Sequence, residues 1–149
     1  MNVDKSQLLL SCLLLGLVYP LNIVHEFGHA FVCALYDQNY NIIFSWLGRS
    51  YSSCLGDDFN RTFFGLAGGL LVMVCLVVIL LIPYFRNNIG SRISLCALLV
   101  TALVNSVVEG FYFEYYNENI IIVQAILLGI LLISFSVLWS SYLRRQKTH

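Results

Sequence analysis

Residues Gln7–Tyr36 read QLLLSCLLLGLVYPLNIVHEFGHAFVCALY, an apolar run of thirty residues without a lysine or an arginine. About 20 apolar residues in helical form cross a bilayer core, so this run is long enough to span a membrane. Pro20 predicts a kink, because proline lacks an N–H group and clashes with the preceding helical turn. The run follows Lys5 as a signal peptide would, but no small-residue cleavage site comes after it, and we interpret it as a spanning helix.

Three further apolar stretches lie between charged residues, at about 62–84, 92–112 and 119–143. The chain is 59% apolar and only 11% charged, whereas soluble domains are about 25% charged. We therefore expect an all-α polytopic membrane protein with about four transmembrane helices, in which residues 1–149 form a single membrane-embedded domain. Eight basic and eight acidic residues leave no net charge, which argues against nucleic-acid binding.

The basic residues predict how the four spans are oriented. Six of the eight fall on the side of the two termini: Lys5, Arg86, Arg92, Arg144, Arg145 and Lys147. Because cytoplasmic loops carry an excess of lysine and arginine, we expect cytoplasmic termini in a multi-pass protein of the cell membrane. The loop Asp37–Arg61 would then face outward. Its alternating stretch NIIFSW, Asn41–Trp46, predicts a short strand after the first helix.

The five cysteines do not form a recognisable pattern of paired residues. There is no C-x-x-C pair, and four of the five lie in apolar segments, where a lone cysteine is usually a small buried hydrophobic residue. The sequence therefore predicts neither a disulfide framework nor a cysteine-based zinc site.

Four ionisable side chains lie inside the predicted spans: His25, Glu26, His29 and Glu109. Each costs a few kcal/mol within a bilayer, so such residues are functional candidates. Three of them form the pattern H-E-x-x-H. Histidines four apart share a helix face and can bind one zinc ion, while the glutamate is rotated by about 100° and addresses a water molecule. The pattern predicts metal-assisted hydrolysis with Glu26 as general base. Alternatively, both histidines only form hydrogen bonds to neighbouring helices.

The motif and its surroundings resemble the site-2 protease family of intramembrane zinc metalloproteases. The segment VHEFGHA, Val24–Ala30, precedes IFSWLG at Ile43–Gly48, which is similar to the family's extended F-S-x-G stretch. The segment AGGLLV, Ala67–Val72, is similar to the family's A-G-P-x-x-N, with glycine in place of proline and valine in place of asparagine. The resemblance covers about residues 20–75 and implies a protease that uses zinc within the membrane.

In that family a later helix supplies the third zinc ligand, an aspartate in a pattern such as N-x-x-P-x-x-x-L-D-G. The segment NSVVEG, Asn105–Gly110, has the asparagine and an acid followed by glycine, but its spacing is shorter, proline is missing and glutamate replaces aspartate. The resemblance implies that His25, His29 and Glu109 bind Zn²⁺ and that Asn105 is a catalytic residue holding the substrate carbonyl or the oxyanion. The outward direction of the first and third spans places these residues in the same half of the membrane.

The substrate implied by the resemblance is a spanning helix of another membrane protein, locally unwound. Four residues could bind it by strand addition, which exposes the scissile amide: Ile42, Ile43, Phe44 and Ser45. Two alternatives stay open. One is a catalytically inactive relative that acts as an assembly or regulatory subunit of a membrane complex, and the other is a zinc-binding or transport protein without a hydrolytic step. Separately, Gly65 and Gly69 form a G-x-x-x-G pair, which predicts close helix packing.

Overall fold

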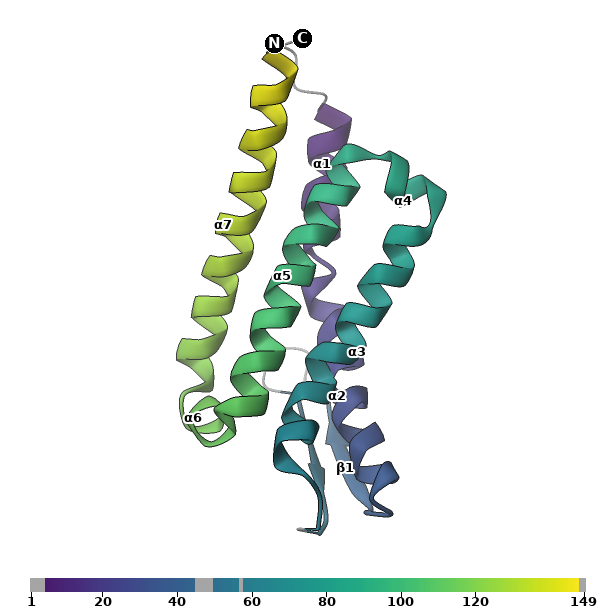
Figure 1. Cartoon of the computed structure of the whole chain (residues 1–149), viewed down its shortest axis with the longest axis vertical. Coiled ribbons are helices and arrows are strands. Elements are labelled where there is room, and N and C mark those ends of the chain that lie inside the picture. Colours follow the sequence, from purple (N-terminus) through teal and green to yellow (C-terminus); the bar gives the residue numbers. More distant parts are fainter. Residues whose placement is uncertain (1–4, 45–49, 57, 148–149) are drawn as a thin grey trace.

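The computed structural model describes residues 5–44, 50–56 and 58–147, which form a bundle of long helices with a small hairpin at one end (Figure 1). Within these residues, four helical segments are long and apolar enough to cross a membrane: Lys5–Leu35, Arg61–Leu81, Ile89–Phe111 and Ile120–Arg145. They match the four predicted spans closely. The expected all-α polytopic membrane fold is therefore confirmed.

The first span consists of two helices, α1 (Lys5–Leu15) and α2 (Val18–Leu35). Between them the Leu17 N–H donates to the Leu14 carbonyl at 3.0 Å, a tighter turn than that of an α-helix. Pro20 explains where the break falls, because a proline ring conflicts with the carbonyl four residues earlier, here that of Gly16. The predicted kink is confirmed.

The other spans are α3 (Arg61–Leu81), α5 (Ile89–Phe111) and α7 (Ile120–Lys147), with the short helices α4 (Pro83–Asn87) and α6 (Phe113–Glu118) between them. Asparagines begin two of the spans, because a side-chain oxygen can accept from an otherwise unpaired N–H of the first turn. Asn60 accepts from the Phe63 N–H and Asn88 from the Ser91 N–H, both at 2.9 Å.

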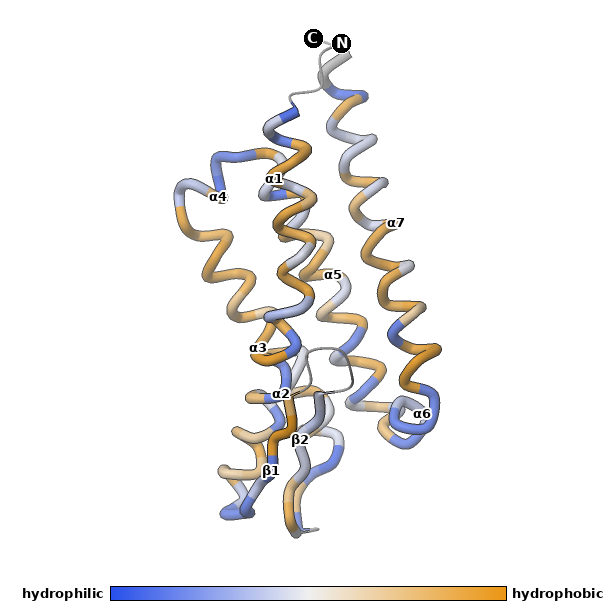
Figure 2. Tube along the Cα trace, turned by 180° about the vertical axis from the view of Figure 1, so that it is seen from behind, coloured by the Kyte–Doolittle hydropathy of each residue, from blue (hydrophilic) through white to orange (hydrophobic). Residues whose placement is uncertain are grey.

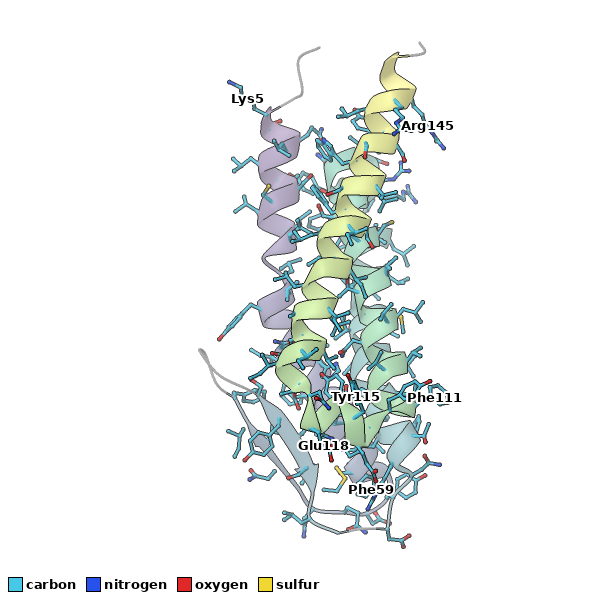
Figure 3. All side chains as sticks on the ribbon, turned by 90° about the vertical axis from the view of Figure 1, so that its left-hand side faces the viewer. Lys5, Phe59, Phe111, Tyr115, Glu118 and Arg145 are labelled. Atoms are coloured by element: carbon cyan, nitrogen blue, oxygen red, sulfur yellow. A yellow bond between two sulfur atoms is a disulfide. The ribbon has the colours of Figure 1, made fainter. Side chains whose placement is uncertain are left out.

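Helix α5 is the centre of the bundle and packs against α1, α3 and α7. The apolar core combines residues from three of these helices: Val72, Leu76, Leu95, Ala97, Leu98, Ala102 and Leu131. Polar residues gather at the two ends of the bundle (Figure 2). Lys5 and Arg145 lie at the end that carries both termini, and Glu118 lies at the opposite end (Figure 3). This arrangement is what an even number of membrane crossings requires.

Helices α3 and α5 approach closely at the two glycines of the G-x-x-x-G pair. A Cβ atom on Gly69 would lie 2.5 Å from the Ser106 Cβ, and one on Gly65 would lie 2.5 Å from the Glu109 carbonyl oxygen. Neither distance is compatible with a side chain, so the predicted close packing is confirmed. Ser106 also donates to the Leu66 carbonyl at 2.8 Å, which fixes α5 to α3 one turn before Glu109.

A two-stranded antiparallel sheet follows α2, with β1 (Tyr40–Ile43) paired to β2 (Tyr51–Cys54). Ile42 lies opposite Ser52 in this register. The predicted strand is confirmed for Asn41–Ile43, but β1 ends there and Phe44 lies beyond it, so the prediction was too long. Ser45 and Trp46, which the prediction also included, lie outside the described residues.

The prediction that the cysteines form no disulfide is wrong, because Cys33 and Cys54 are joined. Cys33 lies near the end of α2, and the hairpin folds back so that the last residue of β2 reaches it; the two Cα atoms are 5.4 Å apart. Cysteine spacing alone does not reveal such a contact, because it depends on the path of the hairpin. A signal was available, since the predicted orientation placed both cysteines toward the outer side.

Thiol labelling tests this disulfide directly. In denatured, unreduced protein we expect a maleimide to label Cys12, Cys75 and Cys96 only, and after reduction to label all five cysteines, as counted by mass spectrometry. Replacing both Cys33 and Cys54 by serine should lower the free energy of unfolding by about 3 kcal/mol, the usual effect of closing a loop of this length. Five labels without reduction would contradict the prediction.

Candidate metal centre

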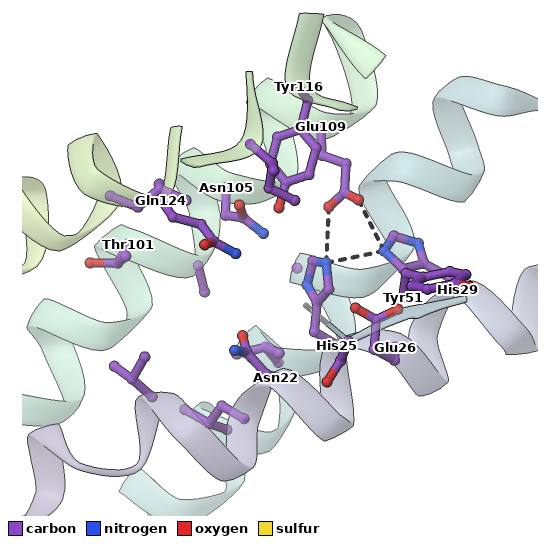
Figure 4. A pocket seen from close by; sticks show the side chains of 18 of the residues that line it. Asn22, His25, Glu26, His29, Tyr51, Thr101, Asn105, Glu109, Tyr116 and Gln124 are labelled. Atoms are coloured by element: carbon purple, nitrogen blue, oxygen red, sulfur yellow. Dashed lines mark hydrogen bonds and ion pairs between the residues drawn. The ribbon is translucent and has the colours of Figure 1, made fainter. Parts of the chain in front are cut away.

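Two histidines of α2 and one glutamate of α5 meet inside the bundle (Figure 4). Glu109 Oε2 lies 2.9 Å from His25 Nε2, and Glu109 Oε1 lies 3.2 Å from His29 Nε2. The two Nε2 atoms are 3.0 Å apart. All three residues are buried, with exposed fractions of 8%, 2% and 6% for His25, His29 and Glu109. The structure thus brings together the three residues that the sequence nominated as ligands.

The main chain of α3 determines which nitrogen of His29 faces the centre. His29 Nδ1 lies 2.7 Å from the Phe64 carbonyl oxygen. A carbonyl only accepts, so Nδ1 donates, and Nε2 of the neutral ring presents its lone pair to His25 and Glu109. The Phe64 ring stacks on the imidazole with a centroid separation of 4.5 Å, which holds the ring plane. A hydrogen bond of this kind orients metal-binding histidines in general.

Several atoms with lone electron pairs, the carboxylate oxygens and the imidazole nitrogens, lie close together at this centre. Glu109 Oε2 is buried and accepts no hydrogen bond from any described residue, although a ring nitrogen lies 2.9 Å away. A carboxylate and lone pairs of imidazole nitrogens repel one another unless a hydrogen or a metal ion lies between them. The repulsion is removed by a hydrogen on a ring nitrogen, in the neutral Nε2–H tautomer or in a protonated ring, or by a metal ion.

The geometry fits a metal ion. The possible ligand atoms of the three residues lie within 4.8 Å of one another. With zinc–ligand bonds of about 2.0–2.1 Å, the ligand atoms of a tetrahedral site are about 3.3 Å apart, close to the observed separations. Two histidines and a glutamate also form a known zinc ligand set that leaves a fourth position open. The residues therefore fit zinc or another divalent metal that accepts nitrogen and oxygen ligands.

Gly68 of α3 makes room for both histidines. A Cβ atom there would lie 2.6 Å from His25 Cε1 and 2.7 Å from His29 Nε2. These are ring atoms at or next to the expected metal-binding positions, so a side chain at residue 68 would displace both ligands. The glycine of the AGG segment is therefore explained by the space the site needs.

We expect Gly68→Ala to lower zinc affinity by at least about 10-fold, because the added methyl group pushes the ligand rings out of position. Competition with a chromogenic chelator in detergent measures the change. Gly129→Ala is the matched control, because a Cβ atom on this glycine of α7 meets nothing within 4 Å. Equal zinc affinity in the two variants would show that Gly68 does not shape the site.

Glu26 lies beside the three candidate ligands without contacting a metal-facing atom of any of them (Figure 4). It is 7% exposed, and its Oε2 accepts a hydrogen bond of 2.7 Å from Ser52 Oγ of β2. Glu26 also lines the cavity that contains His25, His29 and Glu109. A carboxylate at this position can accept a proton from a water molecule at the centre, which is the role its place in the motif predicts.

The cavity has a volume of about 410 Å³ and extends from the three ligands along α2, α5 and α7. Asn105 lies in its wall, and its side-chain oxygen is buried without a hydrogen-bond partner among the described residues. Asn22 and Gln124 lie further along the same cavity (Figure 4). The wall is otherwise largely apolar, with Leu98, Leu127 and Leu131 among its residues. It suits a ligand that is mostly apolar and carries a few polar groups.

The predicted substrate-binding residues do not line this cavity where they are described. Ile42 and Ile43 belong to β1, and Phe44 follows it and contacts the Phe27 ring, whereas the strand that reaches the cavity is β2, through Tyr51 and Ser52. Ser45 is outside the described residues. Sequence reasoning missed Ser52, Gly68 and the Phe64 carbonyl. A serine in a polar loop and a main-chain oxygen have no sequence pattern that marks them as part of a site. Gly68 does have one, because it belongs to the AGG segment that resembles the family pattern.

Comparisons of the whole chain do not extend these observations. No family model, no curated protein and no solved structure matches it.

Proposed function

We propose that this protein is an intramembrane zinc metalloprotease that hydrolyses peptide bonds of membrane-protein substrates within or next to the bilayer. The observation that carries the proposal is the combined geometry of one cavity. Two histidines and a glutamate lie close enough to hold one metal ion, and a second acidic residue, Glu26, stands beside them without being part of the ligand set. A purely structural ion pair does not need that second carboxylate.

Bound by His25, His29 and Glu109, zinc would polarise the scissile carbonyl and make a water molecule easier to deprotonate. Glu26 accepts the proton from this water as its oxygen adds to the carbonyl carbon, and then delivers the proton to the amine nitrogen when the carbon–nitrogen bond breaks. Asn105, one helical turn before Glu109 on α5, donates its amide N–H to the carbonyl oxygen, on which negative charge develops. The products are a carboxylic acid and an amine, and passage of the acid's proton to the amine gives a carboxylate and an ammonium group.

The cavity supports a peptide as the substrate. A segment that unwinds within a bilayer exposes N–H and C=O groups, each of which costs several kcal/mol if unpaired. Side-chain amides donate and accept, so Asn22, Asn105 and Gln124 can pair with both kinds of group in the same cavity. The leucines between them suit the apolar side chains of a spanning helix.

We further propose that the chain is a minimal member or relative of the site-2 protease family. The support is the H-E-x-x-H helix, the hairpin after it and the small-residue segment Ala67–Gly69, which packs against the histidines. The third ligand departs from the family pattern, being a glutamate with a shorter spacing from its asparagine. The position of Glu109 against both histidines shows that this spacing still permits the contact.

The disulfide supports the orientation that the basic residues predict. Disulfides persist mainly in oxidising compartments, so the Cys33–Cys54 bond favours an orientation with the hairpin and the end of α2 outside the cytoplasm. Both termini lie at the opposite end of the bundle and are then cytoplasmic (Figure 1). A reporter fused after residue 149 should be active only if it works in the cytoplasm, and activity of an extracytoplasmic reporter there would contradict this orientation.

One observation favours a second function. The three ligands already contact one another directly, so a protonated histidine could form a buried ion pair with Glu109 and hold α2 to α5 without a metal. A protein of this kind would be a catalytically inactive subunit of a membrane complex. Zinc content separates the two functions. A protein whose centre is an ion pair should contain no zinc after it has been purified and incubated with zinc.

The proposed function is tested with purified protein in proteoliposomes that also contain a set of synthetic transmembrane peptides. We expect new peptide termini, identified by mass spectrometry, only with zinc-loaded protein. A strong zinc chelator should abolish cleavage, and its non-chelating isomer should not. Bound zinc without cleavage of any peptide would favour a zinc-binding or transport protein, and absence of both would favour the subunit.

A further inference from the structure

The strand β2 is attached to α2 at two points on one face of each element. On the strand, Ser52 and Cys54 are two residues apart and therefore point to the same side. On the helix, Glu26 and Cys33 are seven residues apart, two turns, and share a face. Cys54 is bonded to Cys33, and Ser52 Oγ lies 2.7 Å from Glu26 Oε2 and 3.2 Å from the Glu26 carbonyl oxygen.

The shorter contact determines what Ser52 does. A serine hydroxyl has one hydrogen, and the carboxylate at 2.7 Å is the nearer and the charged acceptor, so the hydroxyl donates to Glu26 Oε2. Glu26 has several rotatable bonds, and the hydrogen bond from Ser52 holds its carboxylate in one of the positions that they allow. With Oε2 held by Ser52, Oε1 is the oxygen that can accept a proton from water.

We propose that Ser52 is a positioning residue for Glu26, and that the Cys33–Cys54 disulfide keeps Ser52 in place by fixing β2 to α2. The inference rests on the proposed function, since it assigns Glu26 the role of general base. It makes the strand after the motif helix a part of the site and makes hydrolysis depend on the oxidised state of the hairpin. The hydrogen bond acts on the direction of the carboxylate and leaves the three metal ligands untouched.

The bond itself is tested without metal or substrate. In metal-stripped full-length protein, the thermal unfolding temperature is measured for Ser52→Ala, Glu26→Ala and the double variant. If the two side chains interact, the double variant should lose less than the sum of the single losses. Additive losses would mean that Ser52 and Glu26 do not interact, and would overturn the inference.

The positioning role is tested by kinetics on zinc-loaded protein. We expect Ser52→Ala to lower kcat about 10-fold or more, the usual effect of losing a group that orients a site residue, with KM and zinc stoichiometry unchanged. Ser52→Thr should restore kcat because it keeps the hydroxyl. Ser53→Ala is the matched control, since residue 53 lies on the same strand and points to the other side. An equal loss in Ser53→Ala, or no rescue by threonine, would overturn the role.

The contribution of the disulfide is measured in the Cys33→Ser, Cys54→Ser double variant. We expect kcat to fall with zinc stoichiometry unchanged, and the loss not to add to that of Ser52→Ala, because both changes release the same carboxylate. A full additive loss would overturn the link between the disulfide and Ser52.

Failure of the unmodified protein to bind zinc or cleave any peptide would instead refute the proposed function, and the positioning role with it. Coupling in the metal-stripped protein without an effect on kcat would overturn the positioning role alone.

Discussion

Glu26→Gln is expected to abolish most of the hydrolytic activity while the protein still binds zinc. Glutamine keeps the size of the side chain but cannot accept the proton of water, and general-base catalysis contributes about 100- to 10,000-fold to rate. Zinc should remain, because the proposed ligands are His25, His29 and Glu109, and the Glu26 carboxylate accepts a hydrogen bond from Ser52 instead. The measurements are kcat on a cleaved transmembrane peptide and zinc per protein by elemental analysis.

Glu118→Gln is the matched control for this variant, because it removes the same charge from an exposed position on α6. It should leave both kcat and zinc content unchanged.

The activity and zinc content of Glu26→Gln separate the three functions considered. A protease loses activity and keeps zinc, a zinc carrier keeps both zinc and its function, and an ion-paired subunit has no zinc to keep. Undiminished hydrolysis in Glu26→Gln would contradict the assignment of the general base.

Glu109→Gln is expected to lower zinc affinity by more than about 100-fold. Losing a group that merely orients a ligand costs about 10- to 100-fold, and this substitution removes the only charged ligand of the proposed set. It also removes the negative charge beside two buried histidines, so cleavage should fall with zinc occupancy. Titration with zinc in the presence of a competing chelator measures the affinity.

Glu114→Gln provides the control, because it is exposed on α6, a few residues beyond Glu109, and has no contact with the histidines. Its zinc affinity should equal that of the unmodified protein. Retention of full affinity in Glu109→Gln would show that the carboxylate is not a ligand. The His25–Glu109 and His29–Glu109 contacts would then be an ion pair only, and the inactive-subunit function would be favoured.

Much of the fold could be predicted from the sequence because the bilayer simplifies the problem. Charges are expensive in hydrocarbon, so the gaps between them mark the spans, and a helix is the way a single apolar segment can satisfy its own main chain there. The kink at Gly16 and Leu17 followed from Pro20, and the helix starts at Asn60 and Asn88 follow from ordinary capping. These are local effects, and local effects can be predicted from neighbouring residues.

The candidate site also has a local part that could be predicted from the sequence and a long-range part that could not. His25 and His29 are four residues apart on one helix, so their shared face is a matter of helical period. Glu109 is on another helix, and the sequence could place it only in the same half of the membrane. Whether it reaches the histidines depends on how closely α3 lets α2 and α5 approach, and that is decided by Gly65 and Gly68, where any Cβ would collide with a neighbour.

The sequence by itself therefore determined that this chain has four segments long and apolar enough to span a membrane and an H-E-x-x-H motif in the first of them. Only the tertiary structure decided that Glu109 meets His25 and His29 in a group that could hold a metal ion, that Cys33 pairs with Cys54, and that Ser52 reaches Glu26. The physical reason is the range of the interactions. Hydrophobic burial and helical period act over a few consecutive residues, whereas each of these three contacts joins separate elements whose approach depends on packing across the whole bundle.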